Sequence, residues 1–242
     1  MKNQYLYASI LLIGLVSCGE SKSPQENELS ENIAINITDT INELTADVIE
    51  EVDEVKTDFN LFDDYATILT KDDLIAQFGK ENLEDRTVWY AEGTVERQST
   101  ILTNPNNDHV IKYVWAEEDN VTTSWIEATH YLWDEDFNRH GTQTIETING
   151  LKLGMSLEDL KKWNEADIKF SGFGWDYAGN VFVQSGSKLA ESNVQLTLLN
   201  DQDKSNEGFD FMLGDVELNT AEERLNNAPV LVEMFSIYIE KE

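Results

Sequence analysis

Two stretches of this sequence repeat one short pattern, and this pattern sets much of what the chain can fold into. The first stretch is LTKDDLIAQFG (69–79), and the second is GMSLEDLKKWN (154–164). In each, a hydroxyl residue is followed three positions later by an aspartate and then by a leucine. A hydroxyl that accepts a hydrogen bond from the third helical N–H starts a helix well, especially with an acid at that position. The sequence therefore predicts two short capped amphipathic helices, whose inward-facing residues belong to the core.

Each predicted helix is followed by runs of residues that favour β-strands. The predicted strands cover 87–92, 96–102, 110–116 and 122–133 after the first helix, and 168–170, 180–184, 194–199 and 230–239 after the second. The segment TNPNND (103–108) is rich in turn-forming residues and predicts a loop. We expect an α+β fold of two tandem units, 60–149 and 150–242. Each unit has a short capped helix followed by an antiparallel sheet, and the two units can share one sheet.

The second copy opens with a run of eleven residues that carries a family resemblance. It reads Gly150-Leu-Lys-Leu-Gly154-Met155-Ser156-Leu-Glu-Asp-Leu160. This run resembles the G-x-x-x-G-M-S-x-x-x-[LV] pattern of the beta-lactamase-inhibitor-like superfamily, which includes the small lipoprotein of the outer-membrane barrel-assembly machine. The resemblance implies tandem helix-plus-sheet units and a non-enzymatic binding module that works through exposed sheet faces. It transfers no catalytic residue.

The first residues of the chain are typical of an export signal. Lys2 gives a positive start, and an apolar stretch follows over 5–16 with Ser9 as its polar interruption. As a helix this stretch spans roughly 18 Å, well short of the ~30 Å core of a bilayer, so a secretory signal fits better than a membrane-spanning helix. The stretch ends in Leu-Val-Ser-Cys (15–18), which resembles the lipobox of bacterial lipoproteins.

The lipobox resemblance implies a signal peptide over 1–17, cleavage before Cys18, and acylation of Cys18 by chains such as palmitate. Two or more acyl chains hold a protein stably on a bilayer without spanning it. The alternative is that Cys18, the chain's only cysteine, is a buried free thiol in a core helix. The residue after Cys18 is Gly19 rather than an aspartate, which favours the outer membrane of a bacterial cell envelope. We expect the lipid anchor to be the protein's contact with the membrane.

The segment 18–59 is predicted to be an acidic tether between the anchor and the globular part. Its first part is polar, and over 33–56 apolar residues recur every three or four positions, which predicts a helix. This segment is either a solvated helical or disordered stalk, or a coiled-coil or docking helix. Acids dominate the whole chain, with 47 Asp plus Glu against 17 Lys plus Arg and a formal net charge of −30. Such a charge repels phosphate backbones, so we exclude nucleic acid as a partner.

The sequence shows no recognisable catalytic or metal-binding pattern. The three histidines (His109, His130 and His140) lack ligand spacing, and no Gly-x-Ser-x-Gly elbow is present. With 47 acids, carboxylate pairs arise by chance. The run DQDKSNEG (201–208) is similar to a calcium loop, but Asn206 stands where that loop requires glycine. We therefore predict no catalytic residues, no metal site and no cofactor.

The most distinctive stretch of the globular part is FSGFGWDYAGN (170–180). Its small residues let the backbone turn sharply, so that large flat side chains can gather on one side of a strand. The sequence predicts a binding platform for an envelope protein or glycan, made by Phe173, Trp175, Asp176 and Tyr177. The alternative is that these aromatic side chains close the core between the two units.

These observations favour a lipid-anchored, non-catalytic binding or assembly module for an envelope protein or glycan. Two alternatives stay open: a glycan hydrolase whose acids the sequence does not reveal, and a purely structural spacer of the envelope. A hydrolase would bring titratable groups with shifted pKa values together in a cleft, whereas a binding module would expose an apolar surface.

Overall fold

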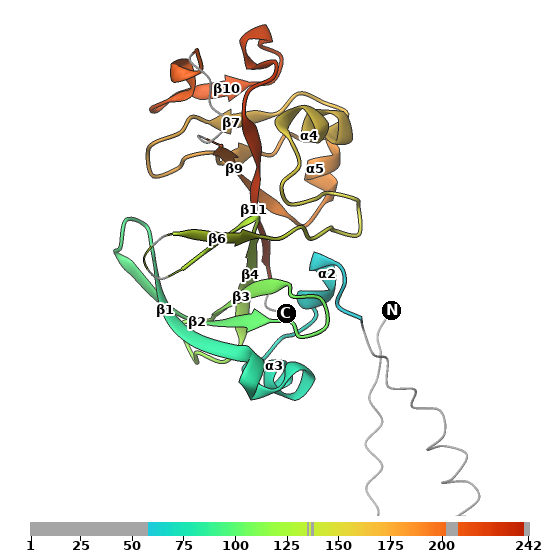
Figure 1. Cartoon of the computed structure of the whole chain (residues 1–242), viewed down its shortest axis with the longest axis vertical. Coiled ribbons are helices and arrows are strands. Elements are labelled where there is room, and N and C mark those ends of the chain that lie inside the picture. The colour runs from blue at the N-terminus through green and yellow to red at the C-terminus, as the bar shows by residue number, and fades with distance from the viewer. Residues whose placement is uncertain (1–57, 135, 137, 202–207, 240–242) are drawn as a thin grey trace, which may run out of the picture. The chain divides into compact units, whose positions relative to one another are not determined.

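The computed structural model describes residues 58–134, 136, 138–201 and 208–239 (Figure 1). The predicted signal peptide, Cys18 and the predicted helix over 33–56 lie outside the described residues, as does nearly all of the tether. Within the described ranges, no helix is both long enough and apolar enough to cross a bilayer.

A six-stranded antiparallel sheet, in the order β1-β2-β3-β4-β11-β9, organises the globular part (Figure 1). The first four strands follow one another along the chain as a meander: β1 (Leu83–Tyr90), β2 (Val95–Thr103), β3 (Val110–Trp115) and β4 (Thr123–Thr129). The last two positions are taken by β11 (Val230–Tyr238), which pairs with β4, and β9 (Gln195–Asn200), which pairs with β11. The predicted α+β class is confirmed, and strands from both halves of the chain contribute to this sheet.

The two predicted capped helices are confirmed as α3 (Lys71–Phe78) and α4 (Leu157–Asn164). The Thr70 hydroxyl accepts a hydrogen bond from the Asp73 N–H at 3.2 Å, and the Ser156 hydroxyl accepts one from the Asp159 N–H at 3.1 Å. Each hydroxyl satisfies one of the N–H groups that a helix leaves without an intrahelical partner. Leu74 and Phe78 of α3 turn inward and are buried, as are Leu157 and Leu160 of α4.

The core lies between the inner face of the sheet and the short helices that cover it. It contains the largest fully buried side chains of the described residues, among them Tyr65, Tyr113, Trp115 and Phe235. The short helix α2 (Phe62–Tyr65) packs onto the last strand, because the rings of Phe62 and Phe235 lie 5.6 Å apart. The start of the globular part is thus held against its end.

The second half of the chain departs from the predicted repeat. Its strands divide between the six-stranded sheet and a three-stranded sheet of β10 (Glu217–Asn219), β7 (Lys169–Ser171) and β8 (Val181–Phe182). The arrangement of two units with equivalent sheets is therefore not confirmed, since strand pairing depends on distant partners rather than on the local pattern that the two copies share. Elements that the sequence did not predict include α2, α5 (Lys188–Glu191), η1 (Lys80–Asn82), η3 (Asp210–Met212), η4 (Glu223–Leu225) and β10.

The predicted strand over 122–133 is interrupted. At His130 the backbone N–H donates to the Glu233 carbonyl at 2.6 Å, and beyond it β5 (Tyr131–Trp133) leaves the main sheet and pairs with β6 (Arg139–Thr142). The apolar run is continuous in sequence, but its first part belongs to the main sheet as β4 and its last part pairs with β6 as β5. The strands with which it pairs therefore set the position of the interruption.

Candidate functional site

The alternation of side chains along β4 separates a core face of the main sheet from an outer face. Ile126 and Ala128 are buried in the core, so Trp125 and Glu127 lie on the outer face. The register of the neighbouring strands brings Tyr238 opposite Trp125 and Lys112 opposite Glu127. Residues from three different strands therefore meet on this face.

The β1–β2 hairpin folds over this outer face. The Tyr90 hydroxyl at the end of β1 donates a hydrogen bond to Glu127 Oε1 at 3.1 Å. In a flat sheet β1 and β4 would lie about 14 Å apart, at ~4.8 Å for each of three strand spacings. Contact between them requires a strongly coiled sheet, so we call this side of the sheet the concave face.

Glu127 is the centre of the concave face and is only 5% exposed. Its Oε1 accepts hydrogen bonds from Tyr90 and from Trp125 Nε1, the latter at 2.8 Å, and its Oε2 accepts one from Lys112 Nζ at 2.7 Å. A buried carboxylate with both oxygens satisfied holds its donors in fixed positions. Burial and the neighbouring Glu127 charge raise the pKa of Tyr90, so its hydroxyl stays protonated and remains a donor.

Three aromatic rings form a rigid cluster around Glu127, which we call the aromatic platform: Tyr90, Trp125 and Tyr238. The Trp125 and Tyr238 rings stack with centroids 5.7 Å apart, and the Tyr90 ring meets Trp125 edge-on at 5.3 Å. Tyr238 is nevertheless 54% exposed. The platform thus exposes the Tyr238 ring, which the Trp125 ring backs by stacking.

A groove of about 400 Å³ continues the concave face from Glu127 toward the β5–β6 hairpin. Arg86 Nε donates a hydrogen bond to Glu84 Oε1 at 2.7 Å, so the opposite charges of these two side chains offset each other. The charges of Lys112 and Glu127 offset each other in the same way. Trp133, 42% exposed, gives the groove a second aromatic ring. The remaining lining residues are Ile101, Thr103, Val110, Ala128, Thr129, Leu132 and His140.

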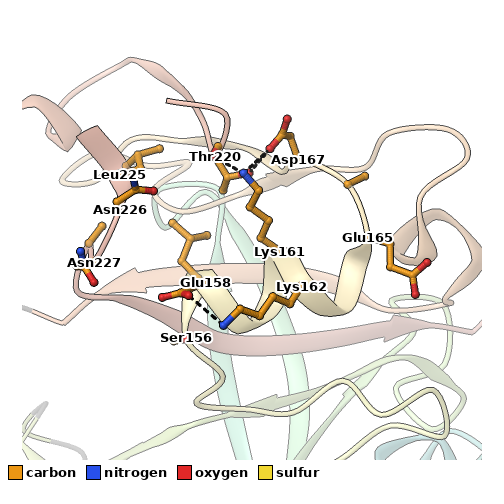
Figure 2. A pocket seen from close by; sticks show the side chains of 13 residues that line it. Ser156, Glu158, Lys161, Lys162, Glu165, Asp167, Thr220, Leu225, Asn226 and Asn227 are labelled. Atoms are coloured by element: carbon orange, nitrogen blue, oxygen red, sulfur yellow. Dashed lines mark hydrogen bonds and ion pairs between the residues drawn. The ribbon is translucent and has the colours of Figure 1, made fainter. Parts of the chain in front are cut away.

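A second and larger groove, of about 910 Å³, lies beside α4 (Figure 2). Its two lysines are both engaged by acids: Lys161 Nζ contacts Asp167 Oδ1 at 2.7 Å and donates to the Thr220 carbonyl at 2.8 Å, and Lys162 Nζ contacts Glu158 at 2.9 Å (Figure 2). Because these ammonium groups are paired, the groove offers no ready anion site.

Five residues of titratable or aromatic character converge where β5 and β6 meet β11. The Arg139 guanidinium lies 3.5 Å from the centre of the Tyr131 ring, and the Tyr131 hydroxyl donates to Asp201 Oδ2 at 3.0 Å. Burial raises the pKa of Glu233 to about 7, although the Trp133 indole and the Arg139 charge act in the opposite direction. Two carboxyl groups therefore come close together, but neither is among the described residues that line the two grooves.

The predicted platform in the segment 170–180 is divided between core and surface. Phe173 is buried, with its ring 6.0 Å from that of Phe170, so it belongs to the core as the alternative interpretation had it. Trp175 is partly buried and its indole N–H donates to the Gly172 carbonyl at 2.9 Å, whereas Tyr177 is 62% exposed. Contact with the Asp176 carboxylate raises the pKa of Glu92, so this segment neighbours the tip of the β1–β2 hairpin.

The three histidines lie in separate parts of the fold and contact different residues. His109 Nδ1 lies 3.2 Å from the Tyr65 hydroxyl, His130 Nδ1 lies 2.8 Å from the Gln143 carbonyl oxygen, and His140 lines the groove of the concave face. Burial lowers the pKa of His109. In the part of the chain that the structure describes, no three residues of the metal-binding types come together as a candidate site.

Sequence reasoning missed the residues of the concave face. Trp125 and Glu127 alternate with the buried Ile126 and Ala128, which is a usable signal that one face of this strand is not core. No such signal links them to Tyr90 or Tyr238, since those residues come close through strand pairing and hairpin coiling.

Comparison of the chain with protein-family models, curated proteins and solved structures finds no significant match. The family resemblance drawn from the sequence therefore stays a prediction.

Proposed function

We propose that this protein is a lipid-anchored component of a bacterial cell envelope, held on the outer membrane through Cys18, and that its globular part is a non-catalytic binding module. The concave face is its binding surface, and its partner is an envelope protein or glycan. The signal-like segment and the lipobox pattern support the anchor.

The observation that carries the binding role is the buried, fully hydrogen-bonded Glu127 beneath the partly exposed aromatic platform. Surface aromatic rings ordinarily sample several rotamers, and fixing them on binding costs free energy. Here the fixing is done by Glu127 and by ring stacking before any ligand arrives. Because the rings are fixed beforehand, less free energy is lost when a ligand binds to the platform. This advantage does not depend on any reaction of the ligand.

A glycan hydrolase is the second candidate, and one observation favours it. Glu233 has a pKa of about 7 and lies near the buried Asp201, so one carboxyl can stay protonated while the other is ionised. The proposal of a binding module is preferred because the grooves are lined by residues other than these two acids. Release of reducing sugars from isolated envelopes by the purified protein, lost in Glu233→Gln, would support the hydrolase instead.

A crosslinking pull-down from intact envelopes tests the binding proposal. We expect Tyr238→Ala to lose the partner, because it removes the most exposed ring of the platform. Trp89→Ala is a matched control: Trp89 is 58% exposed on β1, one residue before Tyr90 and therefore on the opposite face of the strand. If folded Tyr238→Ala recovers as much partner as folded Trp89→Ala and the unaltered protein do, the concave face is not the binding surface.

A further inference from the structure

The concave face holds two exposed aromatic positions with a polar stretch between them. Tyr238 projects from the aromatic platform at one end, and Trp133 from the groove at the other. Glu127 links the two regions, since it binds Tyr90 and Trp125 of the platform and also lines the groove. Between Trp125 and Thr129 the strand β4 advances about 13 Å, at ~3.3 Å per residue. The surface is therefore long and continuous rather than a single pocket.

The charges of this surface are balanced where a ligand would lie. The groove contains two acids, Glu84 and Glu127, and two bases, Arg86 and Lys112, and each base contacts one of the acids. The chain as a whole carries a formal −30, which repels polyanions over the range of a Debye length, about 8 Å at physiological salt. An anionic polymer gains no net electrostatic attraction from the paired charges of the groove, and the net negative charge of the chain repels it at longer range. A neutral ligand therefore fits this face best.

The same polar stretch argues against a protein partner. A protein interface is depleted of charge at its centre, and a protein that covered this stretch would take the partly exposed Glu84, Arg86 and Lys112 side chains out of water. A sugar chain presents hydroxyls that can donate and accept along such pairs while its apolar ring faces stack on aromatic side chains. It also leaves much of the stretch in contact with solvent.

We infer that the concave face binds a neutral glycan chain that lies along β4, with Tyr238 and Trp133 stacking on separate sugar units and the Glu84, Arg86 and Lys112 side chains bonding the hydroxyls between them. This inference rests on the proposed binding role and specifies its partner. Glu127 is the positioning residue of the site, because it fixes Tyr90 and Trp125 rather than lying open to the ligand.

The test uses glycans from the envelopes of the cells that produce the protein. They are separated by anion exchange into a neutral and an anionic pool, labelled at their reducing ends and passed over the immobilised full-length protein purified in mild detergent. We expect retention of the neutral pool. Tyr238→Ala and Trp133→Ala should each weaken retention at least tenfold, which corresponds to about 1.4 kcal/mol, whereas Trp89→Ala should leave it unchanged.

The outcomes separate this inference from the proposed function. Absence of retention, retention of the anionic pool alone, or equal retention by Tyr238→Ala and the unaltered protein would each overturn the neutral-glycan inference. If glycan-free envelope proteins are captured and Tyr238→Ala loses them, the binding module stands and the glycan inference falls. If Trp89→Ala weakens retention as much as Tyr238→Ala does, the loss is not specific to the concave face and the inference also falls. Circular dichroism of each variant verifies that the fold is retained.

Discussion

Replacing Glu233 with glutamine is expected to stabilise the protein at neutral pH, with an effect that grows as pH rises. Glu233 lies at a bulge in β11, where the register with β9 moves from Val232–Leu198 to Met234–Thr197. Its Oε2 is buried without a hydrogen-bond partner among the described residues, and burial raises the pKa of Glu233 from an ordinary 4.5 to about 7. The folded state therefore resists ionisation of this group more than the unfolded chain does.

The sign and size of the effect follow from this difference in pKa. Below pH 4.5 the carboxyl is protonated in both states and costs nothing. Between pH 4.5 and 7 the unfolded chain releases the proton and the folded protein keeps it, so this group lowers the free energy of unfolding progressively and then by a constant amount above pH 7. The full difference corresponds to about 3 kcal/mol. Solvent at the accessible part of the side chain reduces this, and we expect about 1 to 2 kcal/mol between pH 5 and pH 8.

The assay is urea unfolding followed by tryptophan fluorescence at pH 5, 6, 7 and 8 for the unaltered protein and Glu233→Gln. The amide mimics the protonated carboxyl, so the two proteins should be close in stability at pH 5 and the variant should lead by pH 8. Glu223→Gln is the matched control, because Glu223 is an exposed glutamate in η4, and it should give a difference that does not change with pH.

A Glu233→Gln difference that is flat between pH 5 and 8 would refute the reasoning, because it would mean that Glu233 ionises as easily in the folded state as in the unfolded one. A variant that loses stability at pH 8 would refute it in another way. That result would show that the ionised carboxylate is held by the nearby Arg139 guanidinium and the Trp133 indole more strongly than burial opposes it.

Two further predictions concern the anchor and the chain near Trp175. Cys18→Ala should accumulate as an uncleaved precursor without acyl chains, and this precursor should be released from the membrane fraction under conditions where the unaltered protein is retained. Mass spectrometry and detergent partitioning measure these two changes. A variant with unchanged mass and partitioning would refute the lipoprotein proposal. Gly179→Ala should destabilise the fold by at least about 2 kcal/mol or prevent folding, because Gly179 has φ +71° and its Cβ would sit 1.9 Å from the Leu198 carbonyl oxygen. Gly174→Ala, at φ +83° in open space, should cost only about 1 kcal/mol by thermal unfolding, and equal losses in the two variants would contradict the steric argument.

The sequence by itself determined the local elements of this protein. The hydroxyl and acid that begin α3 and α4 lie within four residues of each other, so the cap forms wherever these helices are placed. The alternation and β-forming residues of β2, β3, β9 and β11 likewise placed these strands to within one or two residues. Such signals are readable because their physical causes act between neighbours in the chain.

Only the tertiary structure decided how these elements combine and where the candidate site lies. The Glu127 network joins Tyr90, Lys112 and Trp125 through strand register and hairpin coiling, and Tyr238 enters from the last strand. The pairing of β11 between β4 and β9 is equally invisible to a local pattern, since any strand with an apolar face could take that place. Phe173 shows the converse: an aromatic residue in a glycine-rich run can serve a ligand or the core, and only its burial decides between them.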